Sequence, residues 1–293
     1  MPHGYFHFCT DGWRDGKLFY TREQYAFGMC LVGILTLIYN IKVYAFVLMP
    51  NHIHIILSGT GFECVDAFIY IKSRLSRRLV RDGYKALPHD YSFKLIPIND
   101  PRQMSANILY VLRNPYEKQF SLPASYPWGS GWSCFSGIEG FIQGKPVRLL
   151  TSRERRDLFG TLCKVPDEWS VHPKLGLLPS CFVDRSMLNK LFETPKQFET
   201  RLVKDYESFV QIARSFDEKL EYSREELSDI LHTLLGKRFP GRRLEELKID
   251  EKGEIAVILQ REYDLDSTIV ARLMRLPERI VRQFNTAKEY KYI

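Results

Sequence analysis

The stretch VYAFVLMPNHIHIIL, residues 43–57, decides the fold. Its two apolar runs, Val43–Leu48 and His52–Leu57, are short and rich in β-branched and aromatic residues, which is typical of strands. Pro50 and Asn51 lie between the runs and are turn-forming residues. The stretch therefore predicts two consecutive strands with a turn between them.

The two histidines of the second strand are the feature that needs explaining. Because alternate side chains of a strand share a face, His52 and His54 point the same way, and the apolar residues that alternate with them line the opposite, buried face. Two imidazoles on one face can supply adjacent ligands to a divalent cation. The alternative is a pair of hydrogen-bonded histidines at a sheet edge, and the short motif taken alone favours that alternative.

A second stretch, NILYVLRNPYEKQF at residues 107–120, contains a candidate nucleophile. On a helix, Tyr110 and Asn114 lie one turn apart on the same face, and Pro115 predicts that the helix ends or kinks just after them. A metal held by two histidines would neutralise a phosphate there, and the phenolate of Tyr110 would attack phosphorus. Taken alone, Tyr110 is more simply an ordinary half-buried aromatic, because the chain has 16 tyrosines.

Strand and helix patterns alternate up to about residue 130. The expected strands are Tyr5–Thr10, Val43–Leu48, His52–Leu57 and Ser92–Ile98, and the expected helices are Thr21–Asn40, Val65–Arg81 and Pro101–Arg113. Helices interleaved with antiparallel strands predict a compact α+β unit.

Three regions are expected along the chain. The Gly- and Ser-rich stretch that begins at Trp128 predicts that the first region, residues 1–136, ends there. Prolines break residues 137–220 into short helical and irregular pieces that connect the two ends. Residues 221–293 are expected to be helical, and their first helix opens with the capping-box residues Ser223 and Glu226. The predicted fold class is therefore α+β followed by an all-α C-terminal extension.

The composition favours a basic intracellular protein. The chain has 293 residues with a formal net charge of +7, which suits a polyanionic partner, although a generically basic soluble protein fits equally well. Its six cysteines are scattered and never form a CxxC pair, which argues against a zinc ribbon and against a disulfide framework. The N-terminal residues show no signal-peptide pattern, and the apolar run Ala26–Tyr39 is short for a membrane span. We expect a cytoplasmic location and no membrane partner.

These motifs together resemble a known family. MPNHIHIIL is similar to the HUH motif (histidine, hydrophobic, histidine) of single-tyrosine transposases of the IS200 type. Its Asn51, together with the YxxxNP pattern from Tyr110 to Pro115, resembles the branch called REP-associated tyrosine transposases. Smaller matches are GYFHF, LFYTREQY and YPWGSGWSCF, the last with an insertion-like GSGW. The resemblance covers roughly residues 3–136.

The resemblance implies a fold and a chemistry. The fold would be a ferredoxin-like or RRM-like antiparallel sheet with helices on one face. His52 and His54 would bind Mg²⁺ or Mn²⁺, with Asn114 as a third ligand. Tyr110 would form a 5′-phosphotyrosyl link to single-stranded DNA and release a 3′-hydroxyl, which reseals the strand by the reverse reaction. Family members act as dimers or as monomers, and the sequence leaves both open.

A basic helix follows the histidine strand. Its cationic residues are Lys72, Arg74, Arg77, Arg78 and Arg81. Ile69, Leu75 and Leu79 are the expected core contacts of this helix. Next to an HUH motif, we expect these cations to lie close to the metal site and to neutralise DNA phosphates. The alternative is a solvated helix face.

The C-terminal stretch, residues 254–284, has the spacing of a helix-turn-helix. Three short helices with breaks near Asp264 and Pro277 are expected. The apolar residues expected to pack them are Ile255, Ile258, Leu259, Ile269, Val270, Leu273, Ile280, Val281 and Phe284. Arg275, Arg279 and Arg282 would then be available to a duplex groove. A helical bundle without a ligand has the same spacing.

The sequence thus favours an enzyme that cuts and rejoins single-stranded, hairpin-containing DNA in the cytoplasm, in association with the nucleoid. The alternative is a non-catalytic DNA-binding regulator that uses the C-terminal helix-turn-helix. A metal-dependent phosphohydrolase ranks last, because residues 59–66 offer no obvious carboxylate cluster beside the histidines.

Overall fold

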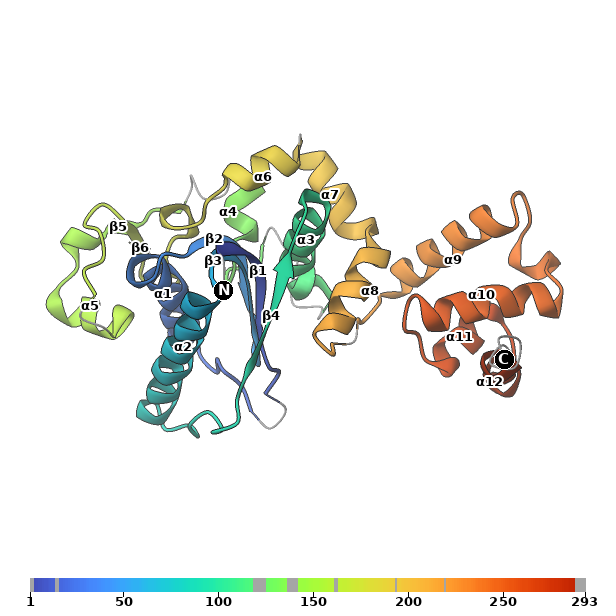
Figure 1. Cartoon of the computed structure of the whole chain (residues 1–293), viewed down its shortest axis with the longest axis horizontal. Helices are drawn as coiled ribbons and strands as arrows, with labels where there is room; N and C mark the ends of the chain where they lie inside the picture. The colour runs from blue at the N-terminus through green and yellow to red at the C-terminus, as the bar shows by residue number, and fades with distance from the viewer. Residues whose placement is uncertain are drawn as a thin grey trace. The chain divides into compact units, whose positions relative to one another are not determined.

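The computed structural model describes residues 3–13, 16–117, 125–135, 142–160, 163–192, 194–218 and 220–287. The chain divides into two compact units, Met1–Lys204 and Asp205–Ile293 (Figure 1). Sequence analysis placed boundaries near residues 136 and 220, whereas the contacts join the connecting region up to Lys204 to the unit that carries the main sheet. Within the described ranges, no helix is both long enough and apolar enough to cross a membrane.

The first unit is built on a four-stranded antiparallel sheet. Its strands are β1 (His3–Thr10), β2 (Lys42–Leu48), β3 (Ile53–Thr60) and β4 (Phe93–Ile98), in the spatial order β2-β3-β1-β4. The predicted pair β2 and β3 is confirmed: Leu48 lies opposite Ile53, and Val47 lies opposite His54. Strand β1 is central and pairs with both β3 and β4.

Two helices connect these strands. Helix α1 (Arg22–Ile38) begins after Thr21, whose side chain caps it as predicted, and most of its residues are buried. Helix α2 (Gly61–Arg81) starts four residues earlier than expected, because Thr60 and Glu63 form a capping box directly after β3. The resulting β-α-β-β-α-β order is that of ferredoxin-like folds, so the predicted α+β class is confirmed.

Helices cover both faces of the main sheet. Phe8 points away from the side of its neighbours His7 and Cys9, and its ring lies 6.3 Å from that of Phe68 on α2. On the other face, His7 contacts Asn107 of α3 (Pro101–Glu117). Figure 1 shows α2 and α3 on opposite sides of the strands. The family resemblance implied helices on one face only, and that expectation is wrong here.

Helix α3 also runs further than expected. Pro115 lies inside the helix, which continues to Glu117. Proline removes one backbone donor but does not forbid the next residues from keeping helical dihedrals. The helix therefore does not end at Asn114, as one form of the prediction had it, and Asn114 lies within the helix.

The segment after Trp128 belongs to the main sheet and is no linker. The Leu48 amide donates to the Trp128 carbonyl at 2.8 Å, and the Ser130 amide donates to the Phe46 carbonyl at 3.0 Å. A Cβ on Gly129 would lie 2.8 Å from that Phe46 oxygen, so the close approach needs glycine. This segment thus covers the outer edge of β2 and leads into α4 (Gly131–Phe135).

The rest of the first unit packs against α1 and α3. A small second sheet contains β5 (Lys145–Pro146), β6 (Ser170–His172) and β7 (Gly176–Leu177). The helical segments are η2 (Val147–Leu149), α5 (Ser152–Phe159), η3 (Pro179–Cys181), α6 (Ser186–Leu191) and α7 (Pro195–Lys204). Gly176 has φ +77°, and a Cβ there would run into the backbone carbonyl of Ala26, which fixes glycine at this contact with α1.

The described part of the second unit is helical. Its elements are α8 (Tyr206–Ser215), α9 (Arg224–Arg238), η4 (Leu244–Glu246), α10 (Ile249–Arg261), α11 (Ser267–Met274) and α12 (Glu278–Ala287). The predicted capping box of Ser223 and Glu226 opens α9. Ile255, Leu259 and Val281 are fully buried in a core shared by the last three helices.

Candidate active site on the main sheet

The two predicted histidines lie side by side near the start of β3. His54 is opposite Cys9 of β1 and is 0% exposed, and His52, immediately before the strand, is 7% exposed. Their rings are perpendicular, with centroids 4.8 Å apart. The alternating apolar residues are buried on the other face, as predicted.

Helix α3 brings Tyr110 and Asn114 to the same place. The Tyr110 ring lies edge-on to His54, with centroids 5.6 Å apart and an interplanar angle of 87°. The Asn114 Oδ1 lies 3.4 Å from His52 Nε2. Asn114 Nδ2 donates to the Tyr110 carbonyl at 3.2 Å, and this bond turns the amide oxygen toward the histidine. A single chain therefore brings together all four residues of the predicted site.

One pair of the predicted ligands has the spacing of neighbouring ligands on a divalent cation. Neighbouring ligands on one ion, each at about 2.1 Å from it, lie roughly 3.0–3.4 Å apart. The 3.4 Å between His52 Nε2 and Asn114 Oδ1 agrees with that separation. His52 Nδ1 lies 2.8 Å from the side-chain oxygen of Asn51; when it donates there, Nε2 keeps a lone pair that faces the Asn114 oxygen. A cation between these two acceptors would satisfy both.

Sequence analysis missed three polar residues of this site. His7 Nε2 lies 3.0 Å from His54 Nδ1, and His7 Nδ1 lies 2.7 Å from Asn107 Oδ1. Cys9 Sγ lies 3.8 Å from His54 Nε2. His7 and Cys9 alternate on β1 in the motif HFC, a pattern that marks a shared face. Only the pairing of β1 with β3, which no local pattern gives, brings that face to His54.

Tyr110 is enclosed by its neighbours. Its side chain is 1% exposed, and its ring lies 5.9 Å from that of His7 as well as beside His54. Its helix neighbour Arg113 is 0% exposed. If Tyr110 is the nucleophile, a phosphodiester would reach its phenol oxygen only after the surrounding side chains had moved.

The basic helix α2 does not lie beside the histidines. It packs on the opposite face of the sheet, so the expectation that its cations adjoin the predicted metal ligands is wrong. The reason is the buried stripe of α2, including Leu75 and Leu79 as predicted, which faces the Phe8 side of the sheet. Ile69, by contrast, is 57% exposed and is no core contact.

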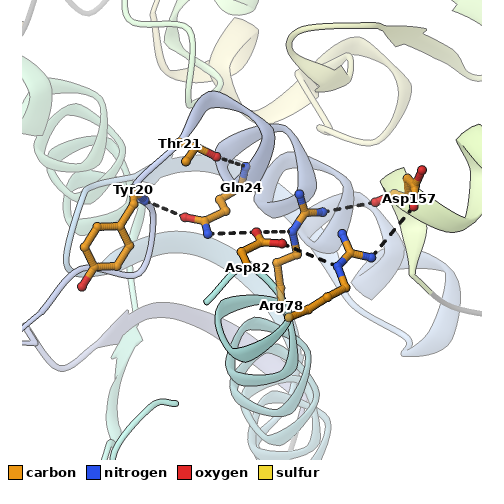
Figure 2. A network of polar contacts seen from close by, with 7 residues as sticks. Tyr20, Thr21, Gln24, Arg78, Asp82 and Asp157 are labelled. Atoms are coloured by element: carbon orange, nitrogen blue, oxygen red, sulfur yellow. Dashed lines mark hydrogen bonds and ion pairs between the residues drawn. The ribbon is translucent and has the colours of Figure 1, made fainter. Parts of the chain in front are cut away.

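Arg78 of α2 belongs to a polar network that joins α2 to α1 and α5 (Figure 2). Gln24 accepts from the Tyr20 amide and donates to Asp82 Oδ2 at 2.9 Å, and Arg78 Nε donates to the same oxygen at 2.7 Å. Arg78 also reaches the backbone carbonyl of Asp157. Burial raises the pKa of Asp82, but the hydrogen bonds and charge of Arg78, with Gln24, outweigh it, and the pKa is lowered overall.

The other predicted DNA contacts of α2 differ in their surroundings. Arg81 lies 3.9 Å from the carboxylate of Asp157. Lys72 Nζ donates to the carbonyls of His89 and Tyr91 at 2.6 and 2.8 Å. Arg74 is half-buried over the Tyr70 ring. Arg77 is exposed and contacts Ser73 of its own helix.

In the second unit, the predicted arginines lie on the surface. Arg275 ends α11 with φ +53° and pairs with Glu245 at 2.7 Å. Arg282 pairs with Glu278 at 2.6 Å along α12, and Arg279 is exposed. These cations are accessible, and two of them already have an acidic partner.

Comparison with known proteins gives one structural similarity. No protein-family model matches the chain. No curated protein matches it either. A similar solved structure is that of a REP-associated tyrosine transposase bound to a REP hairpin, with a TM-score of 0.37 and 18% sequence identity. The similar region covers 45% of this chain and 78% of that chain.

Proposed function

We propose that this chain is a metal-dependent enzyme that cuts and rejoins single-stranded DNA near hairpins. The observation that carries the proposal is the convergence of His52, His54, Tyr110 and Asn114 on one face of the sheet. These are the residues to which the motif resemblance assigns metal binding and nucleophilic attack. Neither the short histidine motif nor one tyrosine among many would support this function alone.

The reaction is a transesterification. The phenolate oxygen of Tyr110 attacks a backbone phosphorus, a new bond to the tyrosine oxygen forms, and the bond to the 3′ oxygen breaks. The proton given up by the phenol is balanced by the proton that the departing 3′ oxygen gains as a hydroxyl. The product is a 5′-phosphotyrosyl link, and attack by a 3′-hydroxyl reverses the step without hydrolysis.

His52, His54 and Asn114 would hold the cation. A bound Mg²⁺ or Mn²⁺ would polarise the phosphoryl oxygens and offset their negative charge. Asn114 also connects the two halves of the site, because its amide touches His52 on one side and the Tyr110 backbone on the other. Movement of α3 would therefore shift ligand and nucleophile together.

The helices α10 to α12 are proposed to contact the duplex stem of the hairpin, as a helix-turn-helix. Arg275, Arg279 and Arg282 are the candidate contacts, through phosphates or a groove. Substituting all three by Gln should weaken hairpin binding and reduce its salt dependence while single-strand cleavage at saturating DNA is kept. Unchanged hairpin affinity and salt dependence would contradict this role.

The proposal is tested by trapping the covalent adduct on a denaturing gel, with Mn²⁺ and labelled hairpin-containing single strands. Tyr110→Phe should bind the DNA but form no adduct. The alternative of a non-catalytic DNA-binding regulator, which is not favoured because it leaves the convergence at Tyr110 unexplained, requires hairpin binding without an adduct in the wild-type protein.

A further inference from the structure

A directional chain of hydrogen bonds ends at His54. It starts at Asn107, whose Nδ2 donates to the backbone carbonyl of Gln103 at 2.8 Å. A carbonyl oxygen only accepts hydrogen bonds, so the group of Asn107 that faces Gln103 must be the amide NH₂. The amide oxygen of Asn107 is therefore the atom that faces His7 Nδ1, at 2.7 Å.

The direction then passes through His7. Because Asn107 Oδ1 only accepts, His7 Nδ1 carries a proton and donates it. A neutral imidazole has one N–H, so His7 Nε2 is an acceptor, and the group facing it at 3.0 Å is His54 Nδ1. His54 Nδ1 must then be the donor, which leaves the lone pair of His54 on Nε2.

Burial strengthens these hydrogen bonds. His7 and His54 are both 0% exposed, and a hydrogen bond in a poorly polarisable interior is stronger than one in water. The sheet register holds the two rings in place, since His7 and Cys9 share a face of β1 and Cys9 lies opposite His54. Asn107 lies one helical turn before Tyr110, on the face of α3 that also carries Asn114.

We propose that His7 and Asn107 are positioning residues, which hold His54 in the tautomer with its proton on Nδ1 and present Nε2 to a divalent cation. The proposal rests on the metal site of the proposed function. Metal-binding histidines commonly donate their second ring N–H to such a partner, and loss of that partner typically costs about 10–100-fold in metal affinity. Here the partner of His54 is a third histidine, His7, whose own tautomer is fixed by the side-chain amide of Asn107.

The first test measures the tautomer without metal. In metal-free protein with ¹⁵N-labelled histidine, at a pH above the usual imidazole range, long-range nitrogen–proton couplings report which ring nitrogen is protonated. The wild type should show His54 protonated on Nδ1. His7→Phe fills the space without accepting, and should move His54 toward the other tautomer. His7→Gln restores a hydrogen-bond acceptor and should return His54 to the tautomer that is protonated on Nδ1.

The second test measures Mn²⁺ affinity by electron paramagnetic resonance of the free ion. His7→Phe and Asn107→Leu should each weaken binding by about 10–100-fold. His7→Gln and Asn107→Asp keep the acceptors and should recover most of the affinity. His3→Phe, at an exposed position of the same strand, is the matched control and should change neither readout.

The outcomes separate the two proposals. A wild-type His54 protonated on Nε2, or a tautomer that His7→Phe leaves unchanged in folded protein, overturns the positioning role. A different result is possible: wild-type His54 is protonated on Nδ1 and His7→Phe shifts this tautomer, but the wild type binds no Mn²⁺. That result would contradict the metal site of the proposed function, and with it the proposal that the hydrogen bonds present His54 to a cation. If His7→Phe fails to fold, Asn107→Leu against Asn107→Asp decides the same question.

Discussion

Asn114 holds its side-chain oxygen 3.4 Å from Nε2 of His52, across the contact between helix α3 and strand β3. The two residues are 62 positions apart in the chain, yet each is already oriented by a neighbour: Asn114 by the Tyr110 carbonyl and His52 by Asn51. The proposed ligands are therefore assembled within one chain, beside that chain's own tyrosine. No partner subunit is needed to bring Tyr110 to His54.

Removing the Asn114 oxygen should weaken cation binding. Asn114→Leu keeps the side-chain volume and loses the ligand, so Mn²⁺ affinity should fall by at least the roughly tenfold that loss of an outer-shell partner costs. Asn114→Asp keeps an oxygen and adds a charge, and should bind at least as tightly as the wild type. Calorimetric titration of the three proteins checks this order. Equal affinity in Asn114→Leu would remove Asn114 from the ligand set.

Local sequence patterns were enough to predict the strands of the main sheet and to place His52 and His54 on one face. Two apolar runs separated by a turn define β2 and β3, and a capping threonine defines α1. Helical spacing also placed Tyr110 and Asn114 on one face. What pattern alone could not give is which strands pair, so His7 and Asn107 went unnoticed although both lie in segments read as strand and helix.

The errors in the sequence-based account share the same cause. A basic helix that follows the histidine strand is expected beside the histidines until one knows which sheet face it covers. Glycine and serine after Trp128 look like a linker until Gly129 is seen against β2. Both features depend on tertiary contacts that leave no periodic signal.

The network around Asp82 should make stability depend on pH. Its pKa is lowered in the folded state, so its contribution is present above the usual aspartate value of about 3.9 and is lost as the pH falls through the folded-state value. Asp82→Asn should therefore lower the free energy of unfolding at neutral pH, and the difference from wild type should shrink in acid. Urea unfolding at several pH values measures this; a difference that stays constant with pH would contradict it. Asp90→Asn, at an exposed loop position, is the control.

Neighbouring arginines of α2 should behave differently. Arg78→Gln breaks a 2.7 Å charged hydrogen bond whose two side chains are 12% and 22% exposed, and should cost about 1.5–3 kcal/mol of stability. Arg77→Gln removes an exposed cation that contacts only its own helix in the described structure, and should change stability little. Urea unfolding of both variants distinguishes them. Equal losses in the free energy of unfolding would show that the Arg78–Asp82 network does not stabilise the protein.

Two glycines with positive φ offer a matched test of the packing between β7 and α1. Gly83→Ala, at φ +87° with nothing within 4 Å of a new Cβ, should cost about 1–2 kcal/mol from backbone strain alone. Gly176→Ala adds a collision with the Ala26 carbonyl and should cost clearly more. Thermal unfolding compares the two, and similar melting temperatures would contradict the close approach.

We propose that Tyr110 forms a covalent bond to DNA in a reaction that depends on the cation held by His52 and His54. The most direct measurement is a denaturing gel of wild type, Tyr110→Phe and His54→Ala with Mn²⁺ and labelled hairpin-containing single strands. A metal-dependent adduct should form in the wild type and in neither variant. An adduct that persists in Tyr110→Phe, or one that forms equally without metal, would contradict it.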